Sequence, residues 1–297
     1  MPIDRSASLR IDSDGLRFSI ARRSLMLKDR SPISGQHSMN NTSQIPFTII
    51  LPTAYGQMLV NRYDINQTNP LIKSGQAVDH AEIMLLVQIL QLLGTNLTVV
   101  DVGANVGTFA LALARCVGAQ GKVHAFEPQR IIFQMLAGSV ALNSLTNVYC
   151  HHLALGECEG RLEIPQFDYS QPLNFGSIEF TAEQVEKLEQ TRRHDPQNIE
   201  YVSLTTLDRF EFDPVHLIKI DAEGMEMRIL EGAIGTLRRC RPVLYVEFLK
   251  SDKAAIQQFV AALDYAIYEN GFCFLCIPAE LKNKIQVTPR PMAPIPA

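Results

Sequence analysis

Two short segments of the chain combine acidic residues with glycines at spacings that suit ligand binding. The first, Asp101-Val-Gly-Ala-Asn-Val-Gly107, follows an apolar run and precedes a helix-like stretch that begins at Thr108. Gly103 and Gly107 allow a tight turn and the close approach of a ligand to the backbone, and a helix start offers unpaired N–H groups to negative charge. Glu127, roughly twenty residues further on, ends a second β-like run, where a carboxylate suits a ribose diol. The spacing predicts a site for a nucleoside-containing cofactor.

The kind of cofactor follows from the order of residues in this first segment. A dinucleotide fingerprint reads Gly-x-Gly-x-x-Gly, and Thr108 stands where its last glycine is expected. Asp101 would repel a pyrophosphate but would attract the ammonium of an amino-acid headgroup. This order resembles the cofactor loop of class I S-adenosylmethionine-dependent methyltransferases. A strand-to-helix turn that binds no ligand is the alternative interpretation.

The second segment, Leu217-Ile-Lys-Ile-Asp-Ala-Glu-Gly-Met-Glu226, places three carboxylates at the end of an apolar strand. Their charges repel one another unless a cation, shared protons or helix N-terminal amides offset them. Helix capping alone is one interpretation, and a substrate site that contains Asp221, Glu223 and Glu226 is the other. Asp221 is the candidate general base because it follows the strand end directly. A Mg²⁺ ion bound by Asp221 and Glu223 would be an alternative means of activating the acceptor.

Strand-like and helix-like segments alternate around these motifs. The expected strands are 98–102, 122–126, 148–152, 217–220, 243–248 and 271–277, and the expected helices are 108–117, 129–143, 225–238 and 252–269. This alternation is typical of an α/β, doubly wound, mostly parallel Rossmann-like sheet. Ligands of such sheets bind beyond the carboxyl ends of the strands, and five residues lie at or just after those ends: Asp101, Glu127, Ala154, Asp221 and Glu247.

The rest of the chain divides by composition. Residues 1–44 are polar and predict a poorly ordered extension. Residues 45–95 predict an α+β extension, with a strand pair and a helix from Asp79 to Leu93, that packs on a core domain spanning 96–285. Residues 286–297 form a proline-rich tail. The long connection 157–204 carries aromatic residues with Asn174 and predicts a substrate-pocket wall; a hairpin plus a solvated helix over 182–193 is the alternative.

Composition excludes several classes of protein. The net charge of −4 and the absence of a basic stripe argue against nucleic-acid binding. The most apolar stretch, 83–93, is too short to span a bilayer. The N-terminus lacks the basic-then-apolar order of a secretory signal. We expect a soluble, cytoplasmic enzyme; the sequence leaves its oligomeric state open.

Together, the motifs resemble those of the FkbM family of methyltransferases. The resemblance covers about residues 97–249 and rests on the two segments above with Phe126-Glu-Pro128, Leu153-Ala-Leu-Gly156, Asn174-Phe-Gly-Ser177 and Thr205-Thr-Leu-Asp208. It implies a class I methyltransferase fold, S-adenosylmethionine as the donor, and O-methylation of a hydroxyl on a sugar, glycan or secondary metabolite. Met225 departs from the pattern, where a small residue is commoner.

The resemblance also implies residue roles. Asp101, Gly103, Asn105 and Gly107 would hold the methionine end of the cofactor. Glu127 would bind the ribose, Pro128 or Gln129 would lie against the adenine, and Ala154 and Leu155 would lie near the adenine edge. Asp221 would face the methyl-transfer zone with Glu223 and Glu226, and Asn174 and Phe175 would contact the acceptor. Two other functions stay open: an NAD(P)-dependent oxidoreductase on a similar sheet, and a non-catalytic relative that binds a partner. The sequence does not identify the acceptor, which is a small molecule or a glycan, nor does it separate O- from N-methylation.

Overall fold

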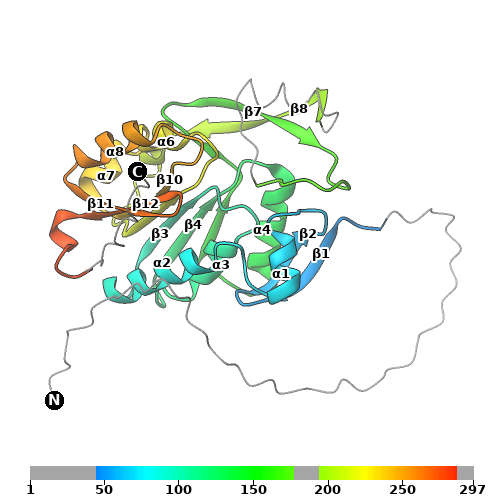
Figure 1. Cartoon of the computed structure of the whole chain (residues 1–297), viewed down its shortest axis with the longest axis horizontal. Coiled ribbons are helices and arrows are strands. Elements are labelled where there is room, and N and C mark those ends of the chain that lie inside the picture. Colours follow the sequence, from blue (N-terminus) through cyan, green and yellow to red (C-terminus); the bar gives the residue numbers. More distant parts are fainter. Residues whose placement is uncertain (1–44, 177–193, 286–297) are drawn as a thin grey trace, which may run out of the picture.

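The computed structural model describes residues 45–176 and 194–285. The expectations for residues 1–44, for the helix over 182–193 and for the proline-rich tail lie outside this part of the chain. A seven-stranded sheet forms the centre (Figure 1). Its order is β11 (Tyr265–Asn270), β12 (Cys273–Pro278), β10 (Val243–Glu247), β9 (Leu217–Ile220), β3 (Thr98–Val102), β4 (Lys122–Phe126) and β5 (Val148–His151). Neighbours from β10 to β5 pair in parallel, whereas β12 is antiparallel to both β10 and β11.

Helices cover both faces of the sheet, as the doubly wound prediction requires. Val99 of β3 packs into the cluster formed with α2 (His80–Leu93), α3 (Thr108–Ala114) and α4 (Arg130–Leu142). Its neighbour Val100 packs on the opposite face, with α6 (Glu226–Glu231), α7 (Ile234–Cys240) and α8 (Lys253–Ala261). Successive side chains of a strand point to opposite faces, so a strand buried on both sides is apolar at nearly every position. The expected α/β fold is therefore confirmed.

Two of the expected helices were wrong in extent. The segment 252–269 was expected to be one helix, but α8 ends at Ala261 and residues 265–270 form β11. Asp264 adopts a left-handed conformation with φ of 60°, which ends the helical turn and sends the chain back along the sheet. The segment 225–238 is broken into α6 and α7 at Gly232, where the chain passes so close to the Gly156 carbonyl that a Cβ would lie 2.0 Å from its oxygen.

Two further groups of elements lie outside the central sheet. The hairpin of β1 (Thr48–Thr53) and β2 (Gly56–Asn61) packs on α4, where Ser139 Oγ accepts a hydrogen bond from the Leu59 amide at 2.9 Å. The short helix α1 (Thr68–Ser74) follows. A separate small sheet has the order β6 (Ala154–Leu155), β8 (His194–Thr205) and β7 (Gly160–Phe167), and its β7–β8 ribbon projects at the top of Figure 1. Two 3-10 turns, Leu207–Phe210 and Ala279–Leu281, complete the described elements.

The segment after β2 is tied to the segment after β7. Asn61 Nδ2 donates to the Tyr169 carbonyl at 2.9 Å, and the Leu173 backbone bonds to Tyr63 and Ile65. We call residues 61–67 and 169–176 together the roof, because both reach the cavity described below. In the described ranges no helix is both long and apolar enough to cross a membrane.

Candidate functional site

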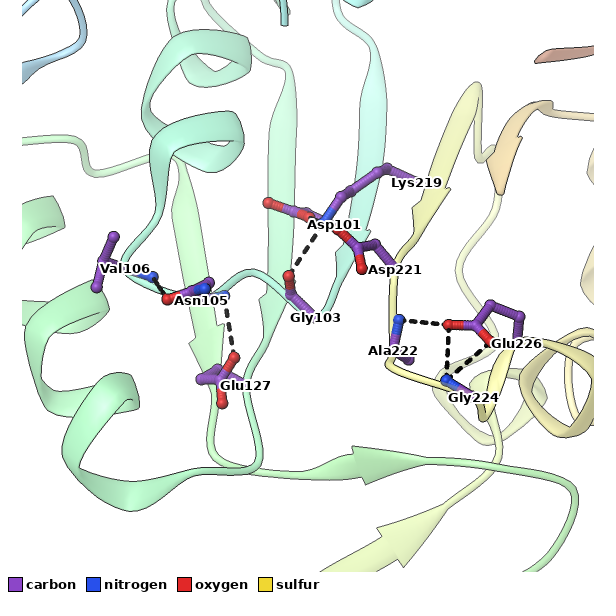
Figure 2. Close-up of polar contacts among 10 residues, drawn as sticks. All are labelled: Asp101, Gly103, Asn105, Val106, Glu127, Lys219, Asp221, Ala222, Gly224 and Glu226. Carbon is purple, nitrogen blue, oxygen red and sulfur yellow. Dashed lines mark hydrogen bonds and ion pairs between the residues drawn. The ribbon is translucent and has the colours of Figure 1, made fainter. Parts of the chain in front are cut away.

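A cavity of about 290 Å³ opens beyond the carboxyl ends of β3, β4, β9 and β10. This is the position at which an open α/β sheet binds its ligands. Most of the residues expected at the site line this cavity: Gly103, Asn105, Glu127, Pro128, Ala154, Leu155, Asn174, Asp221 and Glu223. Four others, Asp101, Gly107, Phe175 and Glu226, are outside its wall. Figure 2 shows the polar contacts that hold the two loops of the site.

Glu127 is fixed at the cavity wall by two backbone amides. Its Oε2 accepts from the Asn105 amide at 2.9 Å and its Oε1 accepts from the Gln129 amide at 2.8 Å. Burial raises the pKa of Glu127 to about 7, although these two hydrogen bonds oppose the shift. Each carboxylate oxygen has further acceptor capacity after one bond. Glu127 can therefore accept from two neighbouring hydroxyls of a ligand.

The glycines of the first loop serve protein packing. Gly103 has φ of 72°, and a Cβ at this position would lie 1.7 Å from the Asp221 carbonyl oxygen. A Cβ on Gly107 would lie 2.7 Å from Leu136 Cδ1 on α4. The first glycine lets the two functional loops touch, and the second lets α3 approach α4. Gly107 is therefore placed against the core, whereas the sequence predicted cofactor contact.

Lys219 is the buried centre of the site, and the sequence analysis did not identify it. Its Nζ lies 3.4 Å from Asp101 Oδ1 and 3.5 Å from Asp221 Oδ2, and it donates to the Gly103 carbonyl at 3.0 Å. The ammonium also lies 4.9 Å from the Phe109 ring centre. Burial alone would lower the pKa of Lys219, but the neighbouring carboxylates hold it above its usual range. The signal in the sequence was a lysine inside the apolar run of β9.

Asp101 is fully buried and faces this lysine, so the structure does not bring it to the cavity wall. Burial raises the pKa of Asp101, and Lys219 opposes that shift. The sequence predicted that Asp101 would meet the ammonium of the cofactor directly. In the structure a protein ammonium takes that position, because Lys219 reaches across from the adjacent parallel strand.

The three carboxylates of the acidic turn have different surroundings. Asp221 and Glu223 line the cavity, and Glu223 forms an ion pair with Lys250. Burial raises the pKa of Glu223 to about 7. Glu226 is buried and accepts from the amides of Ala222 and Gly224 and from a serine hydroxyl, Ser251 Oγ (Figure 2 shows the amide contacts). Glu226 therefore holds the turn that precedes α6, and it is not among the residues that line the cavity.

Two further carboxylates line the cavity. Asp79 directly precedes α2 and lines the cavity, and among the described residues its side chain makes no capping hydrogen bond. Burial raises the pKa of Asp79 to about 6, against the opposing effect of Lys219. Glu247 ends β10, and its Oε2 is buried without a hydrogen-bond partner in the described ranges. Glu247 was noted in the sequence as a strand end but was given no role.

The roof supplies side-chain amides to the cavity. Asn66, Gln67 and Asn174 line it, and the buried oxygens Gln67 Oε1 and Asn174 Oδ1 accept no hydrogen bond from the described part of the chain. Phe175 instead points into the core, with its ring 4.9 Å from that of Tyr169, and its carbonyl accepts from Gln129 Nε2 at 2.9 Å. Phe175 is thus placed as an anchor of the roof and does not contact the cavity.

The described residues contain no group of three or more His, Cys, Asp or Glu side chains arranged to hold a metal ion. Asp221 and Glu223, the pair considered for Mg²⁺, are each joined to a lysine. The geometry of these side chains gives the metal alternative no support.

The curated proteins to which this chain is similar include two methyltransferases. Methyltransferase sdnD of Sordaria araneosa is 28% identical over 165 residues, which cover 47% of this chain and 61% of that protein. Methyltransferase 1 of Beauveria bassiana is 26% identical over 147 residues, which cover 45% of this chain and 57% of that protein. The matched region thus spans about three fifths of these curated relatives.

Solved structures with similar folds were also found. Methyltransferase FkbM from Methylobacillus flagellatus KT is 19% identical with a TM-score of 0.43, and the match covers 61% of this chain and 44% of that one. A putative methyltransferase from Streptococcus mutans, solved in complex with SAH, is 15% identical with a TM-score of 0.40, over 65% of this chain and 94% of that one. The family model described as the methyltransferase FkbM domain matches residues 101–273, more than half of the chain. The chain belongs to the FkbM family of methyltransferases.

Proposed function

We propose that the protein transfers a methyl group from S-adenosylmethionine to a hydroxyl of a sugar, glycan or secondary metabolite. The observation that carries the proposal is the geometry of Glu127, whose two oxygens are each held by one amide at the cavity wall. A carboxylate held in this way presents two adjacent acceptors, which matches the two hydroxyls of a ribose.

The remaining wall fits the rest of this donor. Gly103 and Asn105 would lie along its methionine end, and Pro128, Ala154 and Leu155 would surround the adenine. We assign Asp101 an indirect part, because its carboxylate acts on the loop through Lys219 and Gly103. Asp79 and Asp221 are the wall carboxylates that would face the donor's ammonium group.

The charge of the cavity suits a cationic donor. When bound, S-adenosylmethionine supplies a methyl group on a positively charged sulfur. The described wall contains the carboxylates of Asp79, Asp221 and Glu223, and Lys219 offsets them in part. The protein's contribution is to hold the acceptor oxygen in line with the methyl carbon and to remove the acceptor proton.

The roof favours an acceptor that carries hydroxyl groups. The unpartnered oxygens of Gln67 and Asn174 are hydrogen-bond acceptors and would receive bonds from O–H donors. A buried acceptor left unsatisfied costs about 1–3 kcal/mol. A polyhydroxylated ligand that satisfies both oxygens would recover this cost. We therefore favour a small molecule or glycan acceptor with at least two hydroxyls near the methylated one.

Calorimetric titration with S-adenosylhomocysteine tests the proposal. The wild-type chain should bind, and Glu127→Ala should weaken binding by about tenfold to a hundredfold, because hydrogen bonds to a charged group contribute about 1.5–3 kcal/mol. Glu163→Ala, which changes a carboxylate on the β7 strand outside the cavity wall, is the matched control and should bind as the wild type does. Binding of NADH in place of S-adenosylhomocysteine would refute the proposal.

A further inference from the structure

The strand register places Glu247 next to Asp221 on one face of the sheet. Val246 pairs with Ile220, and Tyr245 pairs with Lys219. Alternate residues of a strand share a face of the sheet. Glu247 therefore lies on the same face as Tyr245, and Asp221 lies on the same face as Lys219. Both carboxylates line the cavity. Two acids therefore lie at neighbouring strand ends of the cavity, whereas the sequence analysis named Asp221 alone as the candidate general base.

The other carboxylates at this edge already have partners. Asp221 lies 3.5 Å from the buried ammonium of Lys219, so a proton accepted by Asp221 would be held beside a fixed positive charge. Glu223 is paired with Lys250. Glu226 is surrounded by hydrogen-bond donors. Asp79 lies in the field of Lys219, which opposes protonation there as well.

Glu247 has the opposite surroundings. Its Oε2 is buried and has no hydrogen-bond donor in the described part of the chain. Burial, together with the neighbouring carboxylates, raises the pKa of Glu247 to about 8 against the opposing charge of Lys219. The charged and titratable groups that face it are three acids of the β9–α6 turn, one lysine of β9 and one thiol of β12: Asp221, Glu223, Glu226, Lys219 and Cys273.

We propose that Glu247 accepts the proton that the acceptor hydroxyl loses during methyl transfer. Lys219 is a positioning residue in this arrangement, because its ammonium holds the Asp221 carboxylate. The inference rests on the methyltransferase function proposed above. In this step the acceptor oxygen forms a bond to the methyl carbon while the carbon–sulfur bond breaks. The electron pair of that bond stays on sulfur and neutralises its charge. The hydroxyl proton passes to Glu247, which releases it to solvent in a later step.

Proton binding by Glu247 can be measured without knowledge of the acceptor. An isotopic label on the glutamate side-chain carboxyl carbons allows each residue to be titrated by NMR, and Glu247→Gln identifies the signal by its loss. In the complex with S-adenosylhomocysteine this signal should titrate near pH 8. A midpoint below about pH 5, the range of an ordinary glutamate, would overturn the proposal.

Turnover provides the second measurement, with methyl glycosides of common hexoses as acceptor probes. For any probe that is methylated, kcat/KM should rise with pH up to about pH 8, and Glu247→Gln should remove this dependence. We expect it to lower kcat by about 10²–10⁴-fold with S-adenosylhomocysteine binding unchanged. Glu269→Gln, a change in an exposed carboxylate on β11, is the matched control.

The variants separate this inference from the function on which it rests. If Asp221→Asn removes the pH dependence and Glu247→Gln leaves it intact, Asp221 is the base and the inference fails while the proposed function stands. If the wild-type chain does not bind S-adenosylhomocysteine, the proposed function itself fails, and the inference fails with it. Glu247→Asp keeps the carboxylate and should retain the pH dependence with a lower rate.

Discussion

Removal of the Lys219 ammonium should destabilise the fold through Asp101. Lys219→Met keeps an unbranched side chain of similar length but leaves the fully buried carboxylate of Asp101 without a positive partner. Breaking a buried ion pair in this way costs about 3–5 kcal/mol. Asp221 contributes less because its side chain is 35% exposed and solvent screens its charge.

The loss should depend on pH with a definite sign. Without Lys219, the folded-state pKa of Asp101 rises further above its unfolded value of about 3.9. The folded chain then binds the proton more tightly, so stability falls as pH rises, by about 1.4 kcal/mol per pH unit until the folded pKa is reached.

Urea unfolding followed by far-UV circular dichroism measures the effect in a chain that contains no tryptophan. The double variant Lys219→Met/Asp101→Asn leaves no fully buried charge at this place and should recover most of the lost stability and lose the added pH dependence. The reasoning is refuted if Lys219→Met loses less than about 1 kcal/mol at pH 7, or if the double variant is no more stable than the single one.

Three further predictions concern the loops and helices of the site. The pKa of about 7 at Glu127 predicts that S-adenosylhomocysteine binds about fivefold more tightly at pH 7 than at pH 6, because the ionised fraction rises by that factor; calorimetry should show this dependence and Glu127→Gln should remove it. Gly103→Ala should unfold at a lower temperature than Gly271→Ala. Both glycines have positive φ, but an added Cβ would collide with the Asp221 carbonyl at position 103 and would meet open space at position 271. Equal melting temperatures would contradict the packing role of Gly103. Asp208→Ala removes the acceptor of two amides at the start of α7, including that of Thr236, and should cost about 1 kcal/mol in urea unfolding with cofactor affinity unchanged.

The central strands could be predicted from the sequence because they are buried on both faces. The segments 98–102, 122–126 and 217–220 have the expected bounds, since each is a short apolar run that ends at a polar or glycine-containing turn. Residues 265–270 were mistaken for helix because apolar residues occur there at spacings compatible with both structures. The left-handed residue that ends α8 is Asp264, so no glycine marked the boundary.

The cavity could be predicted only where strand topology determines it. Glu127 and Asp221 follow strand ends, and parallel pairing brings these ends to one edge of the sheet. Asn66 and Asp79 reach the cavity because the segments after β2 and before α2 come to that edge, which depends on packing between distant parts of the chain. Glu226 could not be separated from its neighbours, because an acid at a helix start can cap the helix, hold the preceding turn or remove a proton, and its hydrogen bonds to the turn are visible only in the structure.

The pairing within the roof limits how acceptor preference can be altered. Residues 61–67 and 169–176 contact each other through Asn61 and Leu173, and both supply amide side chains to the cavity. A loop grafted from a relative into one segment would lose its hydrogen-bonded partner in the other. Successful exchange between homologous enzymes therefore requires both segments from the same parent. Within the family, sequence changes at these two places should occur in concert even though about one hundred residues separate them.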